Sequence, residues 1–205
     1  MQIIGLTGGI GTGKSTVSRI LQQSGAHVVD VDGVVHALQK PHHILWDKIV
    51  SAFGPQFLTG THTLNRKMLA DYIFGDEAMR QALNEIVWPI LWQAVQQQLC
   101  DWKRQNVCLA VLDAPLLFEA RWDQAVNEIW VVSTSETLQI SRVMQRDHLD
   151  YAAAQARCRA QMPLADKVAR AHVVVENSGS LSELKDRVTD LWENAQKKFC
   201  RSEPS

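Results

Sequence analysis

The chain has 205 residues, of which 46% are hydrophobic and 21% are charged. This length fits one large domain with an insertion, since a domain has about 150 residues, and the composition excludes disorder as the overall state. The 21 basic and 22 acidic residues give a formal net charge of -1, so no general basic field is present to hold nucleic acid or an anionic membrane. We therefore expect a globular protein with no nucleic-acid or membrane partner.

We expect no export signal at the start of the chain, because Met1 and Gln2 lead directly into an apolar run that ends in glycines. The longest uncharged stretch, residues 86–100, is too short and too polar to span a bilayer. The four cysteines form no Cys-x-x-Cys pair and have no partnered histidines, which predicts reduced thiols and neither a zinc site nor a redox pair. We expect a cytoplasmic protein.

The first 32 residues predict a strand, a glycine loop, a helix and a second strand. An apolar run over 3–6 stops at glycines, and apolar residues then recur at helical spacing over 17–21. The second strand, over 27–29, closes on Asp30 and Asp32. A crossover of this length joins parallel strands by a right-handed connection.

Residues 33–105 have a helical pattern and predict an all-helical insertion. Residues 54–65 form a predicted loop within it, because glycine, proline and threonine are frequent there. Pro89 is expected to kink or split the last helix of the insertion.

Strands and helices alternate again after the insertion. Short apolar runs predict three further strands, over 107–112, 129–132 and 173–175. Ser133 with Glu136, and Ser180 with Glu183, have the spacing of capping boxes and predict the starts of two helices. Another helix is predicted over 151–159. The alternation predicts an α/β fold with a doubly wound, mostly parallel sheet.

Residues 8–15 fit the phosphate-loop pattern G-x-x-x-x-G-K-S/T, after a predicted strand and at the start of a predicted helix. Glycines let successive N–H groups point at phosphate oxygens, and the start of the helix adds its positive dipole end. Lys14 would neutralise the β and γ phosphates, and the Ser15 hydroxyl is placed to ligate Mg²⁺. The glycine spacing does not fit a dinucleotide fold, and the other alternative is a glycine-rich turn without a ligand. The residues expected to hold the triphosphate are Gly9, Ile10, Gly11, Thr12, Gly13, Lys14, Ser15 and Thr16.

Two aspartates follow predicted strands at the edge of the sheet where ligands bind. Asp32 can act as the base that accepts a hydroxyl proton, or can hold Mg²⁺ through water. The alternative for Asp32 is an N-cap of a helix that starts at Gly33, and Asp30 is favoured as the structural residue of the two. Asp113 stands where a Walker B carboxylate would hold the metal, with a turn-starting aspartate as the alternative.

Residues 142–170 contain six Arg or Lys against three Asp. Arg142 and Arg146 are four residues apart and share a helical face. A run of charges is usually a solvated face, but beside a phosphate loop a mobile basic lid is the better interpretation. Such a lid would exclude water during phosphoryl transfer and supply guanidinium groups to the transferring phosphoryl.

These motifs occur in an order that resembles the dephospho-CoA kinase family, which phosphorylates the ribose 3′-hydroxyl of dephospho-CoA with ATP. The matching segments cover nearly the whole chain: 6–16, 29–32, 64–66, 115–119, 145–147, 161–164 with Lys167, and 174–179. The resemblance implies a phosphate-loop kinase fold, Mg²⁺ as cofactor, and a single domain over 1–205. Its implied parts are a core over 1–32, 106–145 and 171–200, a helical acceptor-binding insertion over 33–105, a lid over 146–170 and a frayed tail over 201–205.

The resemblance also implies roles for individual residues. The implied catalytic residues are Asp32, Lys14 and Arg142. The implied ATP contacts beyond the phosphate loop are Arg142, Arg146 and Asn177. The implied acceptor-binding residues are Thr7, Asp32, Arg66, Pro115, Leu116 and Phe118. The implied metal ligands are Ser15, Asp32 and Asp113.

Three residues depart from the family pattern: Trp88 stands in place of histidine, Asn65 in place of aspartate, and His172 in place of aspartate. None of them falls in the phosphate-transfer core. The alternative functions are a kinase of a nucleoside monophosphate or another small hydroxyl substrate, and a nucleotide-binding regulator. We expect a monomer or a weak homo-oligomer.

Overall fold

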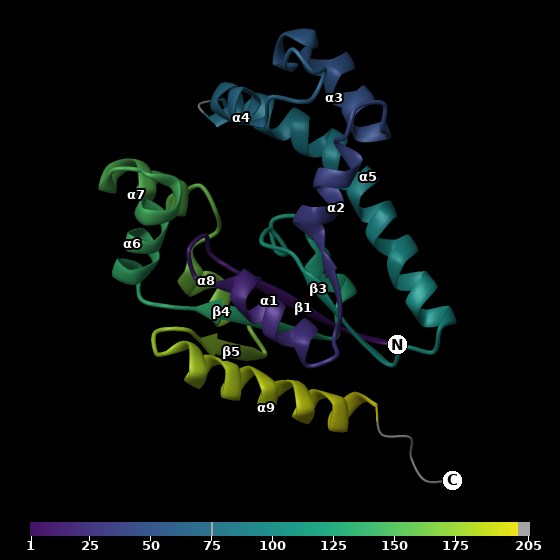
Figure 1. Ribbon diagram of the computed structural model, residues 1–205, viewed down its shortest axis with the longest axis vertical. Coiled ribbons are helices and arrows are strands. Elements are labelled where there is room, and N and C mark those ends of the chain that lie inside the picture. Colours follow the sequence, from purple (N-terminus) through teal and green to yellow (C-terminus); the bar gives the residue numbers. More distant parts are fainter. Residues whose placement is uncertain (75, 201–205) are drawn as a thin grey trace. The chain divides into compact units, whose positions relative to one another are not determined.

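Five strands form one all-parallel sheet in the order β2-β3-β1-β4-β5 (Figure 1). The computed structural model describes residues 1–74 and 76–200. The strands are β1 (Gln2–Gly8), β2 (His27–Asp30), β3 (Leu109–Asp113), β4 (Glu128–Ser133) and β5 (Val173–Glu176). The predicted α/β fold with a parallel sheet is confirmed. The tail predicted over 201–205 lies outside the described residues.

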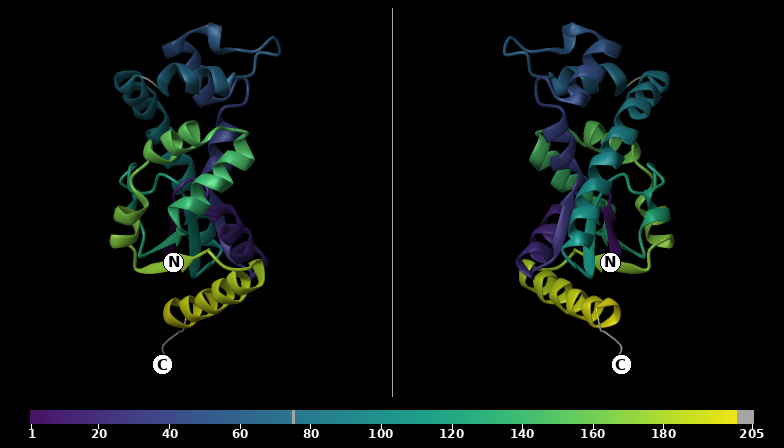
Figure 2. Two further views of the ribbon diagram at one scale, coloured as in Figure 1. Left: turned by 90° about the vertical axis from the view of Figure 1, so that its left-hand side faces the viewer. Right: turned by 90° about the vertical axis from the view of Figure 1, so that its right-hand side faces the viewer.

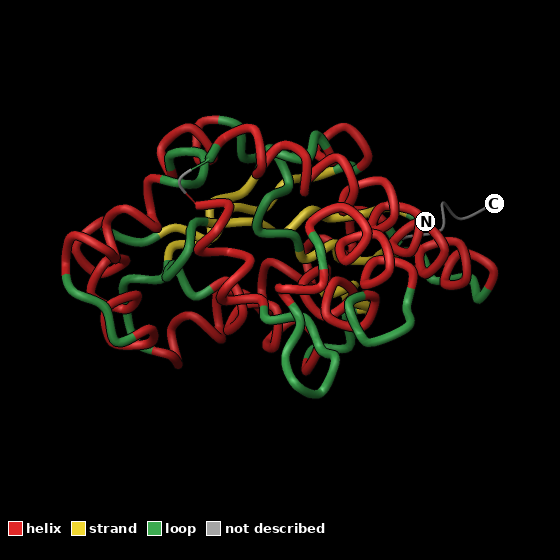
Figure 3. The backbone as a smooth tube through the Cα atoms, turned by 90° about the horizontal axis from the view of Figure 1, so that it is seen from above, coloured by secondary structure: helices red, strands yellow, loops and turns green. Residues whose placement is uncertain are grey.

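Helices and loops connect the strands, which gather in one layer (Figure 3). The helices are α1 (Lys14–Gln23), α2 (Val31–Leu38), α3 (Ile44–Phe53), α4 (Arg66–Phe74), α5 (Glu77–Arg104), α6 (Glu136–Asp147), α7 (Tyr151–Arg159), α8 (Leu164–Ala169) and α9 (Leu181–Phe199), and the 3-10 turns are η1 (Pro55–Phe57) and η2 (Trp122–Ala125). In the part of the chain that is described, no helix combines the length and the apolar composition needed to cross a membrane.

The main core lies between the sheet, α1 and α9. Alternate residues of β1, Ile4 and Leu6, are fully buried there with Leu21 of α1 and Val188 of α9, because side chains alternate between the two faces of a strand. Helix α9 runs beside α1 (Figures 1 and 2). The opposite face of β1 carries Gly5, where an added Cβ would meet the side chains of Leu117 and Val126. Both faces of the sheet are therefore covered, as parallel sheets require.

The chain divides into two units, one formed by residues 1–29 with 102–205 and the other by 30–101. The first unit contains the sheet. The second contains α2, α3, α4 and most of α5, and its own core includes Leu45, Ile49 and Phe57. Within the described residues of this unit, the helical pattern predicted from the sequence is present.

One prediction about a helix start is wrong. Ser133 is the last residue of β4, and α6 is capped by Ser135, whose hydroxyl accepts the N–H of Leu138 at 3.3 Å. The spacing of Ser133 and Glu136 was misleading, because β4 includes Ser133 and the helix is capped two residues later. Pro89 does not split α5, which continues over 28 residues, and the expected kink stays a prediction. The capping box of Ser180 is confirmed at the start of α9.

The prediction that all four cysteines are reduced is also wrong. Cys108 and Cys200 form a disulfide across a sequence separation of 92 residues, with their Cα atoms 5.6 Å apart. Cys200 follows the last residue of α9, and the packing of this helix brings it to the start of β3. Cys100 and Cys158 are free thiols. Sequence spacing does not reveal such a pair, because only the fold brings the two residues together.

Helix α9 is also held to β4 through Glu128. The carboxylate of Glu128 accepts the indole N–H of Trp130 at 2.8 Å and forms an ion pair with Lys198 of α9. Burial by itself would raise the pKa of Glu128, but the hydrogen bonds from Lys198 and Trp130 outweigh it, and the pKa lies below its ordinary value of 4.5. The ionised carboxylate therefore stabilises the attachment of α9.

Candidate functional site

The phosphate loop connects the end of β1 with the start of α1, as the sequence predicts. Gly13, just before α1, has φ of 89°, and a Cβ there would lie 2.1 Å from the Asn177 amide nitrogen. Only glycine fits this close approach without strain. The buried Thr12 hydroxyl donates to the Gly9 carbonyl at 2.8 Å and closes the loop from within. No side chain among the described residues caps α1. The N–H of Thr16 bonds to the Gly13 carbonyl at 2.9 Å, so the N–H groups before it, those of Lys14 and Ser15, are the ones that an anion would use.

Two residues from distant segments meet the phosphate loop at the carbonyl of Thr12. The side-chain amide of Asn177, after β5, donates to this carbonyl at 2.8 Å. The Arg142 guanidinium of α6 donates to it at 3.4 Å and to the carbonyl of Asn177 at 3.1 Å. The structure therefore brings the predicted ATP contacts Arg142 and Asn177 to the loop.

The cation of the loop, Lys14, forms an ion pair with Asp113 at the end of β3. The ammonium nitrogen lies 2.5 Å from a carboxylate oxygen, and the two side chains are 14% and 4% exposed. Parallel pairing of β1 with β3 sets Asp113 opposite Leu6, two residues before the loop begins. The structure thus joins two residues that the sequence analysis had assigned separately to phosphate and metal binding.

The residues at the loop fit a magnesium ion by their chemistry. Ser15, exposed at the second position of α1, supplies a hydroxyl oxygen, and Asp113 supplies a carboxylate. Mg²⁺ prefers such oxygen ligands and completes its shell with phosphates and water rather than with an all-protein cage. Within residues 1–74 and 76–200, no cluster of three His, Cys, Asp or Glu side chains suits a metal.

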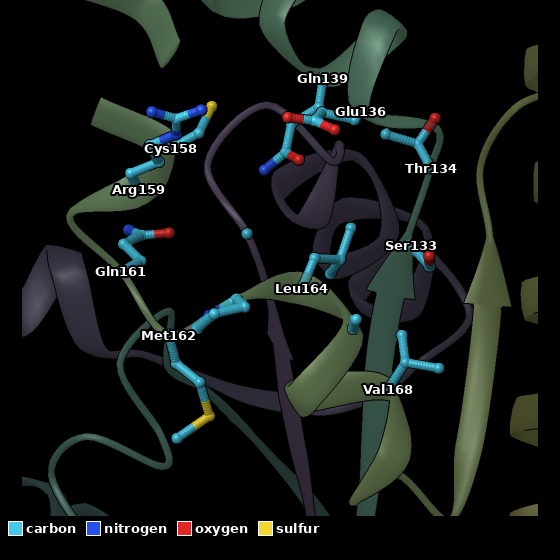
Figure 4. Close-up of a pocket in the computed structure, with 13 residues that line it drawn as sticks. Ser133, Thr134, Glu136, Gln139, Cys158, Arg159, Gln161, Met162, Leu164 and Val168 are labelled. Carbon is cyan, nitrogen blue, oxygen red and sulfur yellow. The ribbon is translucent and has the colours of Figure 1, made fainter. Parts of the chain in front are cut away.

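Two glutamines hold Ile10 at the centre of the loop. The Ile10 N–H donates to Gln161 Oε1 at 2.9 Å, and the Ile10 carbonyl accepts from Gln139 Nε2 at 2.7 Å. Both glutamines line a cavity of about 570 Å³ beside Gly9, and Figure 4 shows them entering it from α6 and from the segment before α8. Sequence analysis included Gln161 in a family motif but gave it no role, and it missed Gln139.

A second set of bonds holds the loop after β3. The carbonyl of Pro115 accepts from the hydroxyl of Thr7 at 3.2 Å and from the ammonium of Lys167 at 2.8 Å. Lys167 also pairs with Glu119 at 3.0 Å. Thr7 and Pro115, both predicted to contact the acceptor, thus bond to each other.

The side chain of Lys167 is 0% exposed. Burial lowers its pKa, and the carboxylate of Glu119 opposes this shift. A buried ammonium is costly unless charge and hydrogen bonds compensate it, so the Glu119 carboxylate and the Pro115 carbonyl are needed to keep it in place. Among the implied acceptor residues of this loop, Leu116 is half-buried. Phe118 is 4% exposed, with the guanidinium of Arg170 4.2 Å from its ring centroid.

The basic segment is partly neutralised within itself. Arg146 and Arg157 both form ion pairs with Asp147, each at 2.7 Å. The hydrogen bond from Arg146 holds the pKa of Asp147 below its ordinary value. Asp147 therefore links Arg146, an implied ATP contact, to Arg157 in the last turn of α7.

Asp32 is the second residue of α2, and its side chain is exposed. The helix begins at Val31 with Asp30 at the N-cap position, so the alternative interpretation of Asp32 as an N-cap is wrong. An added Cβ at Gly33 would lie 2.8 Å from a carboxylate oxygen of Asp30. Asp30 therefore occupies the N-cap position of α2, and Asp32 does not cap this helix.

Arg66, the first residue of α4, lines a cavity of about 230 Å³ within the helical unit. Most of the lining is apolar, and its polar members include Gln39, whose side-chain oxygen is buried without a hydrogen-bond partner. Asn65, the departure beside Arg66, accepts the N–H of Met68 at 3.1 Å. It therefore caps α4, and Asn retains the capping ability of the aspartate it replaces.

The other two departures lie just before β5 and within α5. The Nδ1 atom of His172 accepts the N–H of Ile129 at 3.1 Å, at the start of β4. Trp88 lies within α5 and is half-buried.

Known sequences match the chain over most of its length. A model of the dephospho-CoA kinase family matches residues 2–183. A dephospho-CoA kinase from Symbiobacterium thermophilum is 40% identical over 195 residues, which cover 95% of this chain and 82% of the relative. One from Geobacter sulfurreducens is 41% identical over 192 residues, which cover 94% of this chain and 98% of the relative.

Solved structures show the same fold. The protein TT1252 from Thermus thermophilus has a TM-score of 0.79 at 33% identity, covering 94% of this chain and 97% of its own. A dephospho-CoA kinase from Campylobacter jejuni has a TM-score of 0.71 at 23% identity, covering 97% and 99%, and this second likeness bears on the fold alone. Because the family model covers most of the chain and includes the phosphate loop, the chain belongs to the dephospho-CoA kinase family.

Proposed function

We propose that this protein transfers the γ-phosphate of ATP to the 3′-hydroxyl of the ribose of dephospho-CoA, giving CoA and ADP. The observation that carries the proposal is the family match over residues 2–183. Geometry alone supports only a phosphate-loop kinase, because kinases of many acceptors share this architecture.

The donor phosphates bind along residues 9–16 in this proposal. Backbone N–H groups of the loop and the first turn of α1 surround the phosphates, and Lys14 neutralises the β and γ groups. Arg142 adds a guanidinium at the loop, and its contact with the Thr12 carbonyl supports this assignment. Asn177 bonds to the same Thr12 carbonyl and is proposed to lie near the adenine, and Arg146 is proposed to contact the phosphates.

Asp32 is proposed as the base that orients and deprotonates the acceptor hydroxyl. It follows β2 by two residues, and the carboxyl ends of parallel strands are the usual ligand edge of such sheets. Its exposed carboxylate has no capping role, which supports a role toward substrate. Phosphoryl transfer needs little more from the protein than alignment and charge neutralisation, so one carboxylate is sufficient.

A magnesium ion, when bound with ATP, would neutralise charge on the phosphate oxygens. The chain's proposed ligands for it are the hydroxyl of Ser15, the carboxylate of Asp113 and, through water, Asp32. Asp113 also holds Lys14, so the same carboxylate positions the lysine.

The acceptor is proposed to contact Arg66, whose guanidinium suits the diphosphate of dephospho-CoA. The residues of the first unit that are proposed to contact the acceptor are Thr7, Pro115, Leu116 and Phe118. Residues 146–170 are proposed to form the lid and 33–105 the acceptor-binding region, in a cytoplasmic protein that is a monomer or a weak homo-oligomer.

The test presents the purified protein with Mg²⁺, ATP and one acceptor at a time, and measures ADP release and phosphorylated product. Dephospho-CoA should give acceptor-dependent ADP release with a product that co-migrates with CoA. Faster turnover of a nucleoside monophosphate would replace the proposal by a nucleotide kinase. Tight ATP binding without release of ADP for any acceptor would favour a regulator.

Asp32→Asn tests the base in the same assay. ATP affinity should remain within about 2-fold of the wild type, while kcat falls by about 10²- to 10⁴-fold, the usual contribution of a general base. Asp30→Asn is the matched control, because it makes the same change two residues away at the N-cap position. Equal kcat values for the two variants would remove Asp32 from the mechanism.

A further inference from the structure

The fully buried Lys167 and the half-buried Gln161 have no role in phosphoryl transfer as described above. They lie six residues apart, on α8 and on the connector over 160–163 between α7 and α8. A buried lysine is rare unless paired, and this one bonds to the loop after β3 rather than to its own helix. Lys167, which follows the connector, therefore bonds to the loop after β3, and Gln161 within the connector bonds to the phosphate loop.

Gln161 is the contact between the connector and the phosphate loop. Its Oε1 accepts the Ile10 N–H at 2.9 Å, and the Ile10 side chain packs against a cluster formed by Ile140, Val143 and Ala154. Glycine-rich segments lose more conformational entropy on ordering than others. Holding the residue between Gly9 and Gly11 by its backbone and side chain therefore reduces the cost of ordering the loop around phosphate.

Lys167 fixes the position of this contact through Glu119. One oxygen of Glu119 accepts the N–H of Met162, the residue after Gln161, at 3.0 Å. Lys167 bonds to the same carboxylate and to the carbonyl of Pro115. The ammonium thus joins the connector to the end of β3, and a shift of Glu119 would move Gln161 relative to Ile10.

We propose that Gln161 is a positioning residue for the donor phosphates, acting through the backbone of Ile10, and that Lys167 anchors it while also positioning the Pro115 loop. This inference rests on the proposed function, because it assigns ATP to the phosphate loop and the acceptor to the 115–119 loop. Gln161 therefore affects the donor alone, whereas Lys167 affects both substrates.

The first test compares Gln161→Met, which keeps the length of the side chain and removes the acceptor oxygen, with Gln196→Met on α9. Gln196 is exposed and lies outside the proposed lid and substrate sites, so this control makes the same chemical change away from the loop. Calorimetry with MgATP should give a dissociation constant raised about 3- to 10-fold for Gln161→Met, as expected for one lost hydrogen bond. The KM for ATP should rise by the same factor, with kcat and the acceptor KM unchanged.

The second test removes the anchor. Lys167→Met by itself leaves a buried carboxylate without its partner and can impair folding, so the informative variant is Lys167→Met with Glu119→Gln, in which both charges are lost together. The double variant should fold and should show raised KM values for both ATP and dephospho-CoA. If these residues only support the fold, the double variant should have a lower melting temperature or a smaller active fraction, and both KM values should stay constant.

The outcomes separate this inference from the proposed function. An ATP dissociation constant of Gln161→Met equal to that of Gln196→Met overturns the role of Gln161. A double variant with wild-type KM values overturns the role of Lys167. A wild-type protein that ignores dephospho-CoA refutes the proposed acceptor, and the calorimetric comparison still decides whether Gln161 positions the donor loop.

Discussion

Asp113→Asn changes the partner of the phosphate-loop lysine and leaves the shape of the site intact. Lys14 and Asp113 are 2.5 Å apart, and their side chains are 14% and 4% exposed, so water screens the pair little. Loss of one partner of a buried ion pair costs about 3–5 kcal/mol. The asparagine keeps one oxygen near the ammonium and Lys14 is not fully buried, so we expect about 2 kcal/mol for this pair.

The triphosphate of ATP should compensate this loss, because it supplies new negative charge to Lys14. Free ATP without metal should therefore bind Asp113→Asn more tightly than the wild type, by up to about 30-fold, the equivalent of about 2 kcal/mol. In thermal unfolding, the variant without ATP should melt about 4–8 °C below the wild type, at about 2–4 °C per kcal/mol for a chain of this size. Saturating ATP should return most of this difference.

The assay is a melting curve with and without ATP in the presence of EDTA, followed by calorimetry. EDTA is required because Asp113 is also a proposed magnesium ligand, and with Mg²⁺ the variant should lose turnover. Asp123→Asn is the matched control: it removes the same charge from an ion pair with Arg170, whose side chain is 46% exposed. The control should lose less than about 1 kcal/mol, as exposed pairs do, and its response to ATP should equal that of the wild type. If metal-free ATP stabilises Asp113→Asn no more than the wild type, then Asp113 and phosphate do not compete for Lys14.

Three further predictions concern the loop and the attachment of α9. Gly13→Ala should weaken ATP binding by more than 10-fold, because its Cβ would meet the Asn177 amide. The control is Gly25→Ala, at φ of 84° in open space. It should lose only about 1 kcal/mol of stability through backbone strain and should bind ATP normally. Glu128→Gln should be less stable than the wild type above about pH 4.5. The difference in the free energy of unfolding should vanish as the pH falls through the lowered pKa of the carboxyl. A difference that grows in acid would contradict this. Under non-reducing conditions two of the four cysteines should react with a thiol reagent, and Cys108→Ser should expose one more thiol and lower the melting temperature.

Local sequence gave correct predictions where the physical cause is local. The phosphate loop between a strand and a helix, the limits of α7 and the capping box at Ser180 each depend on residues within a few positions of one another. The capping rule failed at Ser133, because pairing of β4 with its neighbours outweighs the preference of a single residue, and Pro89 does not split α5.

The candidate site was predictable only in part, for the same reason. The residue types at Lys14, Asp113 and Arg142 indicated phosphate chemistry, but not that Lys14 bonds to Asp113 or that Arg142 bonds to the carbonyl of Thr12. Gln139 gave no sequence signal at all, because an amide at a half-apolar helix position has no distinctive spacing.

The sequence by itself determined the α/β class, the position of the phosphate loop and the family, since these follow from the order of motifs and from the period of apolar residues. Only the tertiary structure decided the disulfide of Cys108 with Cys200 and the network from Lys167 to Ile10. Both join residues that are far apart in the chain, so no local pattern of residues reveals them. In the network, burial of the Lys167 ammonium makes its contacts with polar partners necessary.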